Sequence, residues 1–442
     1  MNNTKSHVAI VGAGFAGLVA ARELESLGAE VSIFEARNRI GGRAWTDERL
    51  GIDLEMGATW VHWYQPFIWT EIMRYGKKIY PSPSSEKVYW IADGERYEGN
   101  EEQAAYEQYR VESLILKDSK RFFPFPYEPT YVLDSSGELD ETGKDFIAAD
   151  DKSVLDLLSE RGGTQKDLDI ADSYWSAAFQ GPADEGSSLM AVHQAALSDH
   201  RMPLLDDITL KYKLVGGMKG LYESIASDLQ ANIKLNAGVK RIEEDGEATI
   251  LEFNSGERQI FDAVIVTAPT AALRNITFVP ALSFGQQNLV HEGSNSRGVK
   301  AWIKIRGVHK ILLTAPRPAP LTILRTEYWG EDWSILVGFG PDNEAIDLTS
   351  VESAQSVLDY WDLGLQAIGI AGHDWVADEW SGQTWSTPKK GQFLDGRHHF
   401  RKSSGRIRFA GSDWAYGWNG VFVDGAIESG IQTARSLAEE LL

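Results

Sequence analysis

The feature that most constrains the fold of this chain is a glycine-rich turn near its N-terminus, where Gly12, Gly14 and Gly17 stand at GxGxxG spacing. The apolar run Val8–Val11 precedes them and is typical of a strand buried on both faces. The first glycine permits a tight turn, the second lets the backbone approach a pyrophosphate, and the third allows close packing of helix on strand. Because glycine-rich turns occur in many α/β proteins, the glycine spacing alone does not identify a dinucleotide site, and the neighbouring residues must be considered as well.

The residues that follow supply that context. A segment with helical periodicity runs from Phe15 through Ala16 to about Leu27, and a second apolar run, Val31–Phe34, ends at Glu35. The start of such a helix offers free N–H groups and a positive dipole end to phosphates. An acidic residue roughly 20 residues further on accepts hydrogen bonds from a ribose 2′-OH. The pattern therefore predicts a dinucleotide site.

Composition limits the classes of protein that fit this site. The 442 residues predict roughly two to three domains. The net charge of −21 argues against nucleic-acid and anionic-membrane partners. The chain has no cysteine, which excludes disulfides, thiolate metal ligands and a cysteine-linked cofactor. No His/Asp/Glu set shows metal-ligand spacing. The first strand leaves no room for a cleavable signal and no apolar run nears the roughly 20 residues that span a bilayer, so we expect a cytoplasmic enzyme.

Two further segments suit a cofactor that extends past the first unit. After Glu35 come Ala36 and Arg37 and then the pair Gly41-Gly42 with Arg43, whose forked donors match phosphate or flavin oxygens. The turn Gly57-Ala58-Thr59-Trp60 is flanked by bulky side chains, which favours a backbone pressed against a flat ring; a surface turn is the alternative.

Residues 11–45 together with 53–60 resemble the flavin-containing amine oxidases, the family of monoamine oxidase. The resemblance implies FAD rather than NAD. It also implies an α/β fold, with a Rossmann-like FAD-binding domain of the glutathione-reductase/amine-oxidase type and an inserted α+β substrate-binding domain. The FAD-binding domain would comprise residues 1–86, 210–280 and 382–442, and the substrate-binding domain residues 87–209 and 281–381.

Periodicity predicts several elements within these segments. Helices are expected over 154–158, 168–179 and 351–365, strands over 299–305 and 335–339, and a hairpin turn at Asp245-Gly246. Alternation along 299–305 places Lys300 and Lys304 on one face. Tyr174, Trp175 and Phe179 could line a pocket, although an aromatic helix face is more often core, and His193 and His200 are expected to be structural.

The resemblance implies further cofactor contacts in the later segments. Val239 would pack by its backbone against the adenine, and Asp413 of Gly411-Ser412-Asp413 would lie on the sugar–phosphate chain. Gly420, Val421 and Phe422 would lie near the flavin, ahead of a helix starting near Gly425. The dipole of that helix, aimed at the flavin pyrimidine, favours the anionic reduced ring. No cysteine can link the flavin, so we predict non-covalent FAD.

The same resemblance implies which residues surround the reacting amine. Lys300 aligns with the family lysine that holds a water against flavin N5, and Trp385 matches one of two aromatic walls. The loop carrying the second wall is one residue longer than the family pattern Gly-Tyr-x-Glu-Gly, so either Phe422 or Asn419 takes that place. This departure puts a primary-amine oxidase of the usual sort in doubt.

The pairing of Trp385 with Asn419 and the Gly-Pro-Ala-Asp turn at Gly181 resemble the bacterial nicotine-degrading branch, which includes nicotine and 6-hydroxynicotine oxidases. An asparagine that some of that branch carry is replaced here by Ala177, so its contact does not carry over. The resemblance implies oxidation of a C–N bond of (S)-6-hydroxynicotine, nicotine or a similar pyridine-type amine. Hydride would pass to flavin N5, and O2 would reoxidise the flavin to give H2O2.

Several alternatives stay open from the sequence. The substrate could be a pseudooxynicotine-type amine, an aromatic monoamine or a polyamine, or an L-amino acid if Arg325 clamps its carboxylate. A flavin-bound scaffold without turnover is a third class. Either O2 or a protein can accept the electrons, and a homodimer is one option for the oligomeric state.

Overall fold

The N-terminal motif lies in a five-stranded parallel sheet, in a computed structural model that describes residues 5–134, 139–401 and 405–441. The strand order is β20-β13-β1-β2-β9 and every neighbouring pair is parallel. The strands are β1 (His7–Val11), β2 (Glu30–Phe34), β9 (Asn232–Lys234), β13 (Ala263–Val266) and β20 (Ile407–Phe409). One sheet therefore joins three segments that lie far apart in the chain, and the predicted Rossmann-like α/β class is confirmed.

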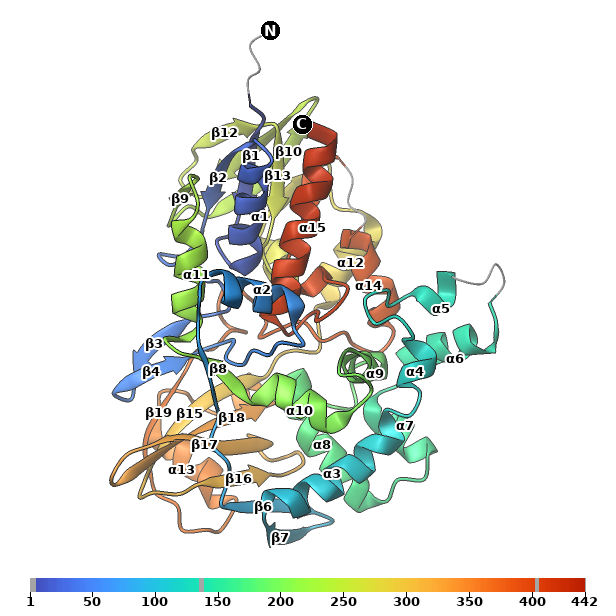
Figure 1. Cartoon of the computed structure of the whole chain (residues 1–442), viewed down its shortest axis with the longest axis vertical. Coiled ribbons are helices and arrows are strands. Elements are labelled where there is room, and N and C mark those ends of the chain that lie inside the picture. Colours follow the sequence, from blue (N-terminus) through green and yellow to red (C-terminus); the bar gives the residue numbers. More distant parts are fainter. Residues whose placement is uncertain (1–4, 135–138, 402–404, 442) are drawn as a thin grey trace.

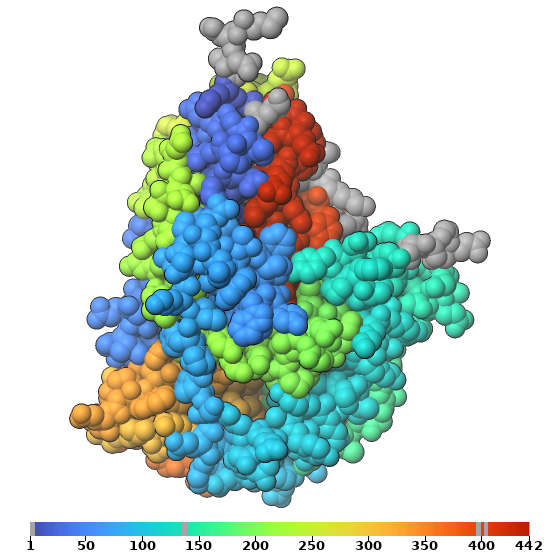
Figure 2. All heavy atoms as spheres, viewed as in Figure 1, coloured from blue at the N-terminus to red at the C-terminus, as the bar shows by residue number. Residues whose placement is uncertain are grey.

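Helices from both ends of the chain cover one side of this sheet. α1 (Phe15–Ser26) lies beside α15 (Val423–Leu441), and α11 (Gly217–Ser227) packs on the other flank of α1 (Figure 1). A Cβ on Gly430 would lie 2.4 Å from the Ala16 carbonyl oxygen, so the absence of a side chain there lets α15 and α1 approach closely. The N-terminal and C-terminal segments accordingly sit side by side in the upper part of the molecule (Figure 2).

A four-stranded sheet stands beside the parallel one, in the order β12-β11-β10-β14. Its strands are β10 (Val239–Asp245), β11 (Ala248–Phe253), β12 (Arg258–Phe261) and β14 (Thr277–Val279). β10 and β11 pair as the hairpin predicted at Asp245-Gly246, with Gly246 at a φ of +62°. This placement puts Val239, the first residue of β10, in one core cluster with Val11 and Phe34 of the parallel sheet.

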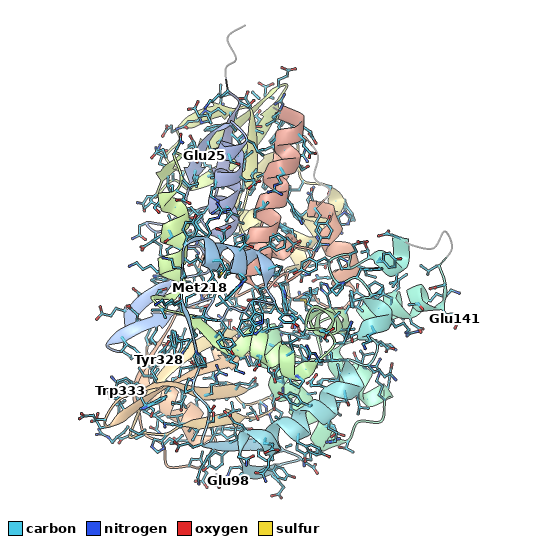
Figure 3. All side chains as sticks on the ribbon, in the orientation of Figure 1. Glu25, Glu98, Glu141, Met218, Tyr328 and Trp333 are labelled. Atoms are coloured by element: carbon cyan, nitrogen blue, oxygen red, sulfur yellow. The ribbon has the colours of Figure 1, made fainter. Side chains whose placement is uncertain are left out.

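The lower half of the molecule is built on a seven-stranded sheet in the order β19-β15-β18-β17-β16-β6-β7. Its strands are β6 (Lys87–Ala92), β7 (Glu95–Gly99), β15 (Val299–Arg306), β16 (Ile311–Thr314), β17 (Ile323–Trp329), β18 (Trp333–Gly340) and β19 (Ala367–Gly372). All pairs are antiparallel except β16 with β6, which joins the two predicted inserted segments. Figure 3 shows Met218 of α11 above Tyr328 and Trp333 of this sheet. The residue limits of the two domains stay a prediction.

A group of helices shares a second hydrophobic core beside that sheet. They are α3 (Glu101–Ile115), α7 (Val154–Glu160), α8 (Gln165–Phe179), α9 (Ser188–Leu197) and α10 (Met202–Leu210). Trp175 and Phe179 of α8 are fully buried in this core, whereas Tyr174 also borders the main cavity. His193 is buried too, with Nε2 2.6 Å from the Pro126 carbonyl oxygen.

Shorter elements complete the chain: α2 (Pro66–Arg74), α4 (Ser119–Phe122), α5 (Tyr131–Asp134), α6 (Glu141–Asp150), α12 (Phe284–Glu292), α13 (Val351–Asp359), α14 (Gln392–Arg401), β3 (Thr46–Arg49), β4 (Ile52–Glu55), β5 (Ile79–Pro81) and β8 (Tyr212–Leu214). The predicted helix over 351–365 was too long, because α13 ends at Asp359. Asp362 and Gly364 then take φ values of +50° and +64°, which a helix cannot continue through. In the part of the chain that the structure describes, no helix is both long and apolar enough to cross a bilayer.

Candidate active site

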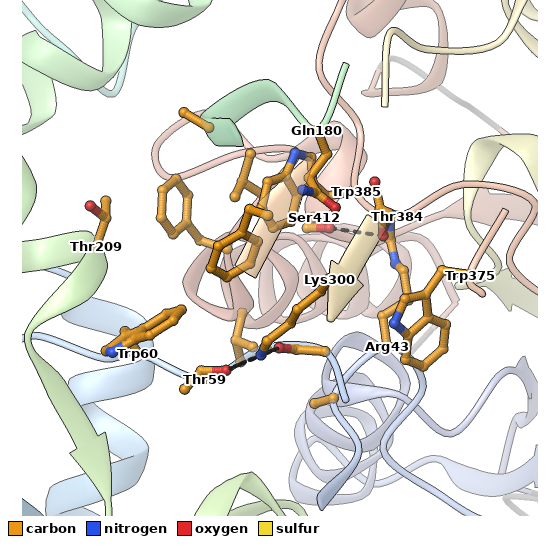
Figure 4. A pocket seen from close by; sticks show the side chains of 18 of the residues that line it. Arg43, Thr59, Trp60, Gln180, Thr209, Lys300, Trp375, Thr384, Trp385 and Ser412 are labelled. Atoms are coloured by element: carbon orange, nitrogen blue, oxygen red, sulfur yellow. Dashed lines mark hydrogen bonds between the residues drawn. The ribbon is translucent and has the colours of Figure 1, made fainter. Parts of the chain in front are cut away.

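A cavity of about 640 Å³ extends from the carboxyl ends of the parallel strands to the seven-stranded sheet and the helices beside it. Val11 and Phe34 border one end, Val337 and Phe339 of β18 border the middle, and Thr209 of α10 borders the opposite side. Figure 4 shows Thr209 and Trp60 on one side of Lys300, and Arg43 and Trp375 on the other. The cavity is thus long enough to bring the predicted cofactor site and the inserted helices into one space.

The three glycines of the opening motif occupy distinct environments at the first end. Gly12 has a φ of +109°, and a Cβ there would lie 2.5 Å from Thr267 Oγ1. A Cβ on Gly17 would lie 2.0 Å from the Gly12 carbonyl oxygen, where helix meets strand. Gly14 has only the Gly42 and Gly41 backbone near its Cβ position, the nearest atom at 3.7 Å, and it borders the cavity at the start of α1. The backbone N–H groups of that first turn have no intrahelical acceptors, which suits an anion.

Glu35 stands at the end of β2 and borders the same part of the cavity. Its Oε2 accepts a hydrogen bond from the Ala13 N–H at 2.8 Å, and its Oε1 accepts one from the Arg37 N–H at 2.9 Å. Each carboxylate oxygen keeps a further lone pair. The two backbone bonds hold the carboxylate in place while it can still accept from a ribose hydroxyl.

Arg43 reaches the cavity from the Gly41-Gly42 turn, held by a carboxylate behind it. Its Nη2 lies 2.8 Å from Asp413 Oδ1 and 3.2 Å from Ser412 Oγ. The other Asp413 oxygen accepts from the Thr270 N–H at 3.0 Å and the Thr270 hydroxyl at 2.8 Å. Burial by itself raises the pKa of Asp413, but the charge of Arg43 and these hydrogen bonds outweigh it and lower that pKa. The carboxylate therefore stays ionised and orients the guanidinium.

Lys300 lies on β15 against the loop that carries Gly57 and Thr59. Its Nζ donates to the Gly57 carbonyl oxygen at 2.7 Å and to Thr59 Oγ1 at 2.5 Å. A Cβ on Gly57 would lie 1.8 Å from the Arg43 carbonyl oxygen, so the loop packs too tightly for any side chain there. Burial lowers the pKa of the Lys300 ammonium, although the carboxylates of Glu55 and Glu327 act in the opposite direction. More of this lysine is neutral near pH 7 than of an exposed one.

Aromatic rings surround the Lys300 amine. Nζ lies 5.5 Å from the Trp60 ring centroid and 5.8 Å from that of Phe339. The ring centroid of Trp385 is 6.4 Å from that of Phe339, and its Nε1 donates to the Phe179 carbonyl oxygen at 3.0 Å. This hydrogen bond fixes the indole orientation. The centre of the cavity is therefore an aromatic space with the Lys300 amine in its wall (Figure 4).

The C-terminal loop closes the cavity beside Trp385. The Ser386 N–H donates to the Gly420 carbonyl oxygen at 3.0 Å, and a Cβ on Gly420 would lie 2.3 Å from the Ser386 carbonyl oxygen. α15 begins directly afterwards at Val423, two residues before the predicted start, and Val423 borders the cavity. A second helix N-terminus thus borders the cavity, and the effect of its dipole on the flavin stays a prediction.

The cavity brings together most of the residues that the sequence singled out. Its lining includes Gly12, Gly14, Phe15, Ala16, Glu35, Ala36, Arg37, Gly42, Arg43, Gly57, Ala58, Thr59, Trp60, Val239, Lys300, Trp385, Gly411, Ser412, Gly420, Val421 and Phe422. Gly17 and Asp413 lie behind this lining, packed against Gly12 and bonded to Arg43 respectively. Asp413 orients Arg43 from this position, and its contact with the sugar–phosphate chain stays a prediction.

The two candidates for the second aromatic wall lie in different environments. Phe422 borders the cavity, and its ring centroid is 4.9 Å from that of Trp418. Asn419 is 2% exposed and lies outside the lining, with no hydrogen-bond partner for its Oδ1 or Nδ2 within the described residues. The geometry thus favours Phe422, and the assignment stays a prediction.

Part of the lining was missed by sequence reasoning. Tyr109 of α3 and Asp206 of α10 border the cavity beside Tyr174. Arg325 of β17, which the sequence had singled out for a substrate carboxylate, borders it beside Trp60. The apolar periodicity of α3, α8 and α10 predicts which face of each helix is buried, but the same signal arises whether that face meets a core or a cavity. Only the packing of three helices from separate parts of the chain distinguishes the two.

A family model described as flavin-containing amine oxidoreductase matches residues 15–438. The chain belongs to this family. It is therefore an enzyme that acts on amines with FAD as its cofactor. The lining of the cavity fits FAD. The backbone at Gly14 is open at the start of α1, where a phosphate would be bound, and Arg43 and Glu35 supply a donor and an acceptor. The Gly57 loop carries no side chain at that position that would keep a ring away from its backbone.

Two relatives of this amine oxidoreductase align along nearly its whole length. Pseudooxynicotine dehydrogenase from Pseudomonas sp is 29% identical and covers 100% of this chain and 88% of its own. Nicotine dehydrogenase from Pseudomonas putida is 28% identical and covers 98% and 88%. Among solved structures, putrescine oxidase with putrescine bound has a TM-score of 0.80 at 23% identity and covers 99% of both chains. The last likeness shows the shared fold.

No cysteine is present to link the flavin, and we predict that FAD is held non-covalently. Precipitating the holoenzyme with acid or heat should therefore release the yellow colour completely into the supernatant, where it is measured by absorbance and identified as FAD by chromatography. Flavin that stays with the precipitated protein would contradict this prediction.

Proposed function

We propose that this enzyme oxidises a C–N bond of a pyridine-type alkaloid amine such as (S)-6-hydroxynicotine or nicotine. Bound FAD would accept the hydride at N5, and O2 would reoxidise it to give H2O2. The observation that carries this proposal is the aromatic cavity around Lys300, with Trp385 in one wall and a C-terminal loop that departs from the usual family pattern. The names of the two relatives, both given for nicotine-related amines, support the same substrate class.

The side chains position the substrate for this reaction, exclude water from it and set the electrostatic environment of the reacting atoms. Bound FAD supplies the hydride acceptor. Trp60, Phe339 and Trp385 form walls of low polarity that disfavour an ammonium ion, so the substrate nitrogen loses its proton on entering. The amine of Lys300 is held by its hydrogen bonds to Gly57 and Thr59. In this position it would bind a water molecule or exchange a proton beside the flavin.

The surroundings of Arg325 argue against the alternative function of an L-amino-acid oxidase, in which this residue would bind the substrate carboxylate. Its Nη2 lies 2.5 Å from Glu327 Oε1, and its Nε lies 2.7 Å from the same oxygen. Arg325 is therefore already paired with a buried carboxylate, which also pairs with Lys213 through its other oxygen at 2.5 Å. A substrate carboxylate bound to Arg325 would lie beside Glu327 and compete with it for the guanidinium.

A panel of amines tests the proposal. We expect (S)-nicotine, (S)-6-hydroxynicotine or pseudooxynicotine to bleach the enzyme-bound flavin faster than tyramine, putrescine or an L-amino acid does under the same conditions, because only the former carry a pyridine ring. Stopped-flow absorbance of the flavin gives the rates. Faster bleaching by tyramine or putrescine would overturn the assignment to pyridine-type amines.

The electron acceptor is tested separately. If O2 is the acceptor, the reduced enzyme should regain its oxidised flavin spectrum within a turnover time on mixing with aerated buffer, and one H2O2 should form for each amine consumed. Both relatives are named dehydrogenases, which favours a protein acceptor as the alternative. Reoxidation far slower than turnover with an artificial dye would favour that alternative.

A further inference from the structure

A carboxylate that the proposed chemistry does not use stands in the cavity wall beside the inserted helices. Asp206 of α10 accepts a hydrogen bond from the Tyr174 hydroxyl of α8 at 2.9 Å on Oδ1, and one from the Tyr109 hydroxyl of α3 at 3.1 Å on Oδ2. All three side chains border the cavity. Three helices therefore converge on one carboxylate whose remaining lone pairs are free for a further donor.

Within the described residues, Asp206 makes no ion pair, although the charge of Arg325 acts on it from nearby and lowers its pKa. The charged groups around Asp206 have other partners. Asp207 pairs with Lys211 at 2.9 Å, Glu112 accepts from the Trp175 indole at 3.0 Å, and Arg325 pairs with Glu327 at 2.5 Å. Burial raises the pKa of Asp206 to about 6, against the hydrogen bonds of Tyr174 and Tyr109. The group can thus either accept a proton from a ligand or share one with it near neutral pH.

The position of α10 places this carboxylate away from the reacting centre. Thr209, one helical turn from Asp206 on α10, lies across Lys300 from Arg43 and Trp375 (Figure 4). Arg43 belongs to the predicted cofactor end of the cavity, and Lys300 marks the place of chemistry. A substrate held beside Lys300 and extended along the cavity would therefore present its far end to Asp206.

We propose that Asp206, oriented by Tyr109 and Tyr174, is a specificity-determining residue that binds a second, basic nitrogen of the substrate, remote from the C–N bond that is oxidised. The inference rests on the proposed function, and it identifies the substrate class as amines carrying such a nitrogen, as a pyridine ring does. The nitrogen and the carboxylate share one proton in a charge-assisted hydrogen bond. The bond orients the substrate without taking part in hydride transfer.

The test compares the fastest pyridyl amine of the panel with its phenyl analogue, in which C–H replaces the ring nitrogen. In the wild-type holoenzyme, kcat/KM should favour the pyridyl compound by about tenfold to a hundredfold, since a hydrogen bond to a charged group has roughly that effect. Asp206→Asn should reduce this preference to about twofold, mainly through KM, and leave the phenyl analogue nearly unchanged. The matched control is Asp207→Asn, which removes the same charge from the same helix and should keep the preference.

A second measurement needs no variant. An alkylpyridine should inhibit the wild-type enzyme about tenfold more strongly than the matching alkylbenzene does. Equal inhibition by the two compounds, an undiminished pyridyl preference in Asp206→Asn, or an equal loss in Asp207→Asn would each overturn the inference, even while pyridyl amines still bleach the flavin. Failure of every pyridyl amine to bleach it, with other amines active, would instead overturn the proposed function on which the inference rests.

Discussion

Replacing Lys300 by methionine should slow turnover by about 10² to 10⁴-fold while FAD stays bound, because a positioned group that exchanges protons contributes an effect of that order. Methionine keeps much of the length of the side chain but lacks the amine, which donates to the Gly57 carbonyl oxygen and to Thr59 Oγ1. Both acceptors belong to the loop predicted to lie on the flavin. Steady-state rates, normalised to bound flavin by absorbance, measure the effect.

Lys304→Met is the matched control for this substitution. Lys304 lies on the same strand and the same face, but its Nζ donates to the Leu50 carbonyl oxygen at 3.1 Å and lies 4.5 Å from the Trp333 ring centroid, outside the cavity. Turnover should change less than about threefold in this variant. A wild-type rate in Lys300→Met with full flavin, or an equal loss in both variants, would remove Lys300 from the proposed chemistry.

Replacing Gly14 by valine should abolish FAD binding and leave the protein folded. The nearest atom to a Cβ at this position is the Gly42 Cα at 3.7 Å, an ordinary contact, so the backbone need not move. The valine methyl groups would instead fill the space before the first turn of α1, where a pyrophosphate approaches the backbone. We expect at least a 100-fold loss of FAD affinity, measured by quenching of flavin fluorescence on titration, on the order of 3 kcal/mol.

Gly220→Val provides the comparison for Gly14→Val. Gly220 lies within α11 with only Lys77 Nζ near its Cβ position, at 3.9 Å, and does not border the cavity. This variant carries the same change of residue type and should bind FAD as the wild type does. Circular dichroism checks that both variants fold. Normal FAD content in folded Gly14→Val would contradict the placement of the cofactor at α1.

The cofactor end of this fold was predictable because its stereochemical demands are local. Gly12 needs a positive φ, Gly17 leaves no space for a side chain, and Glu35 follows a short buried strand. Each of these requirements fixes the residue type at a position within one short segment of the sequence, where it can be recognised. The seven-stranded sheet was not predictable in the same way, because its parallel pairing of β16 with β6 joins segments more than 200 residues apart.

The substrate end was predicted only in part, for a related reason. Trp385 and Lys300 could be located because their segments match family motifs. Asp206 and Tyr109 were not singled out, and for Tyr174 the sequence left pocket and core open, because the apolar faces of these helices indicate burial alone. The longer loop before α15 left Asn419 and Phe422 as equal candidates. The difference between them depends on how the loop folds onto Ser386, which spacing does not encode.

The most direct test of the account is anaerobic mixing of the purified holoenzyme with (S)-nicotine, (S)-6-hydroxynicotine or pseudooxynicotine. The account predicts that at least one of them bleaches the flavin absorbance fully with no O2 present, in a rapid first-order phase, and that one oxidised product forms for each flavin reduced. A flavin that keeps its oxidised spectrum with each of these amines, and with tyramine and putrescine as well, would contradict it and would point to a flavin-bound scaffold without turnover.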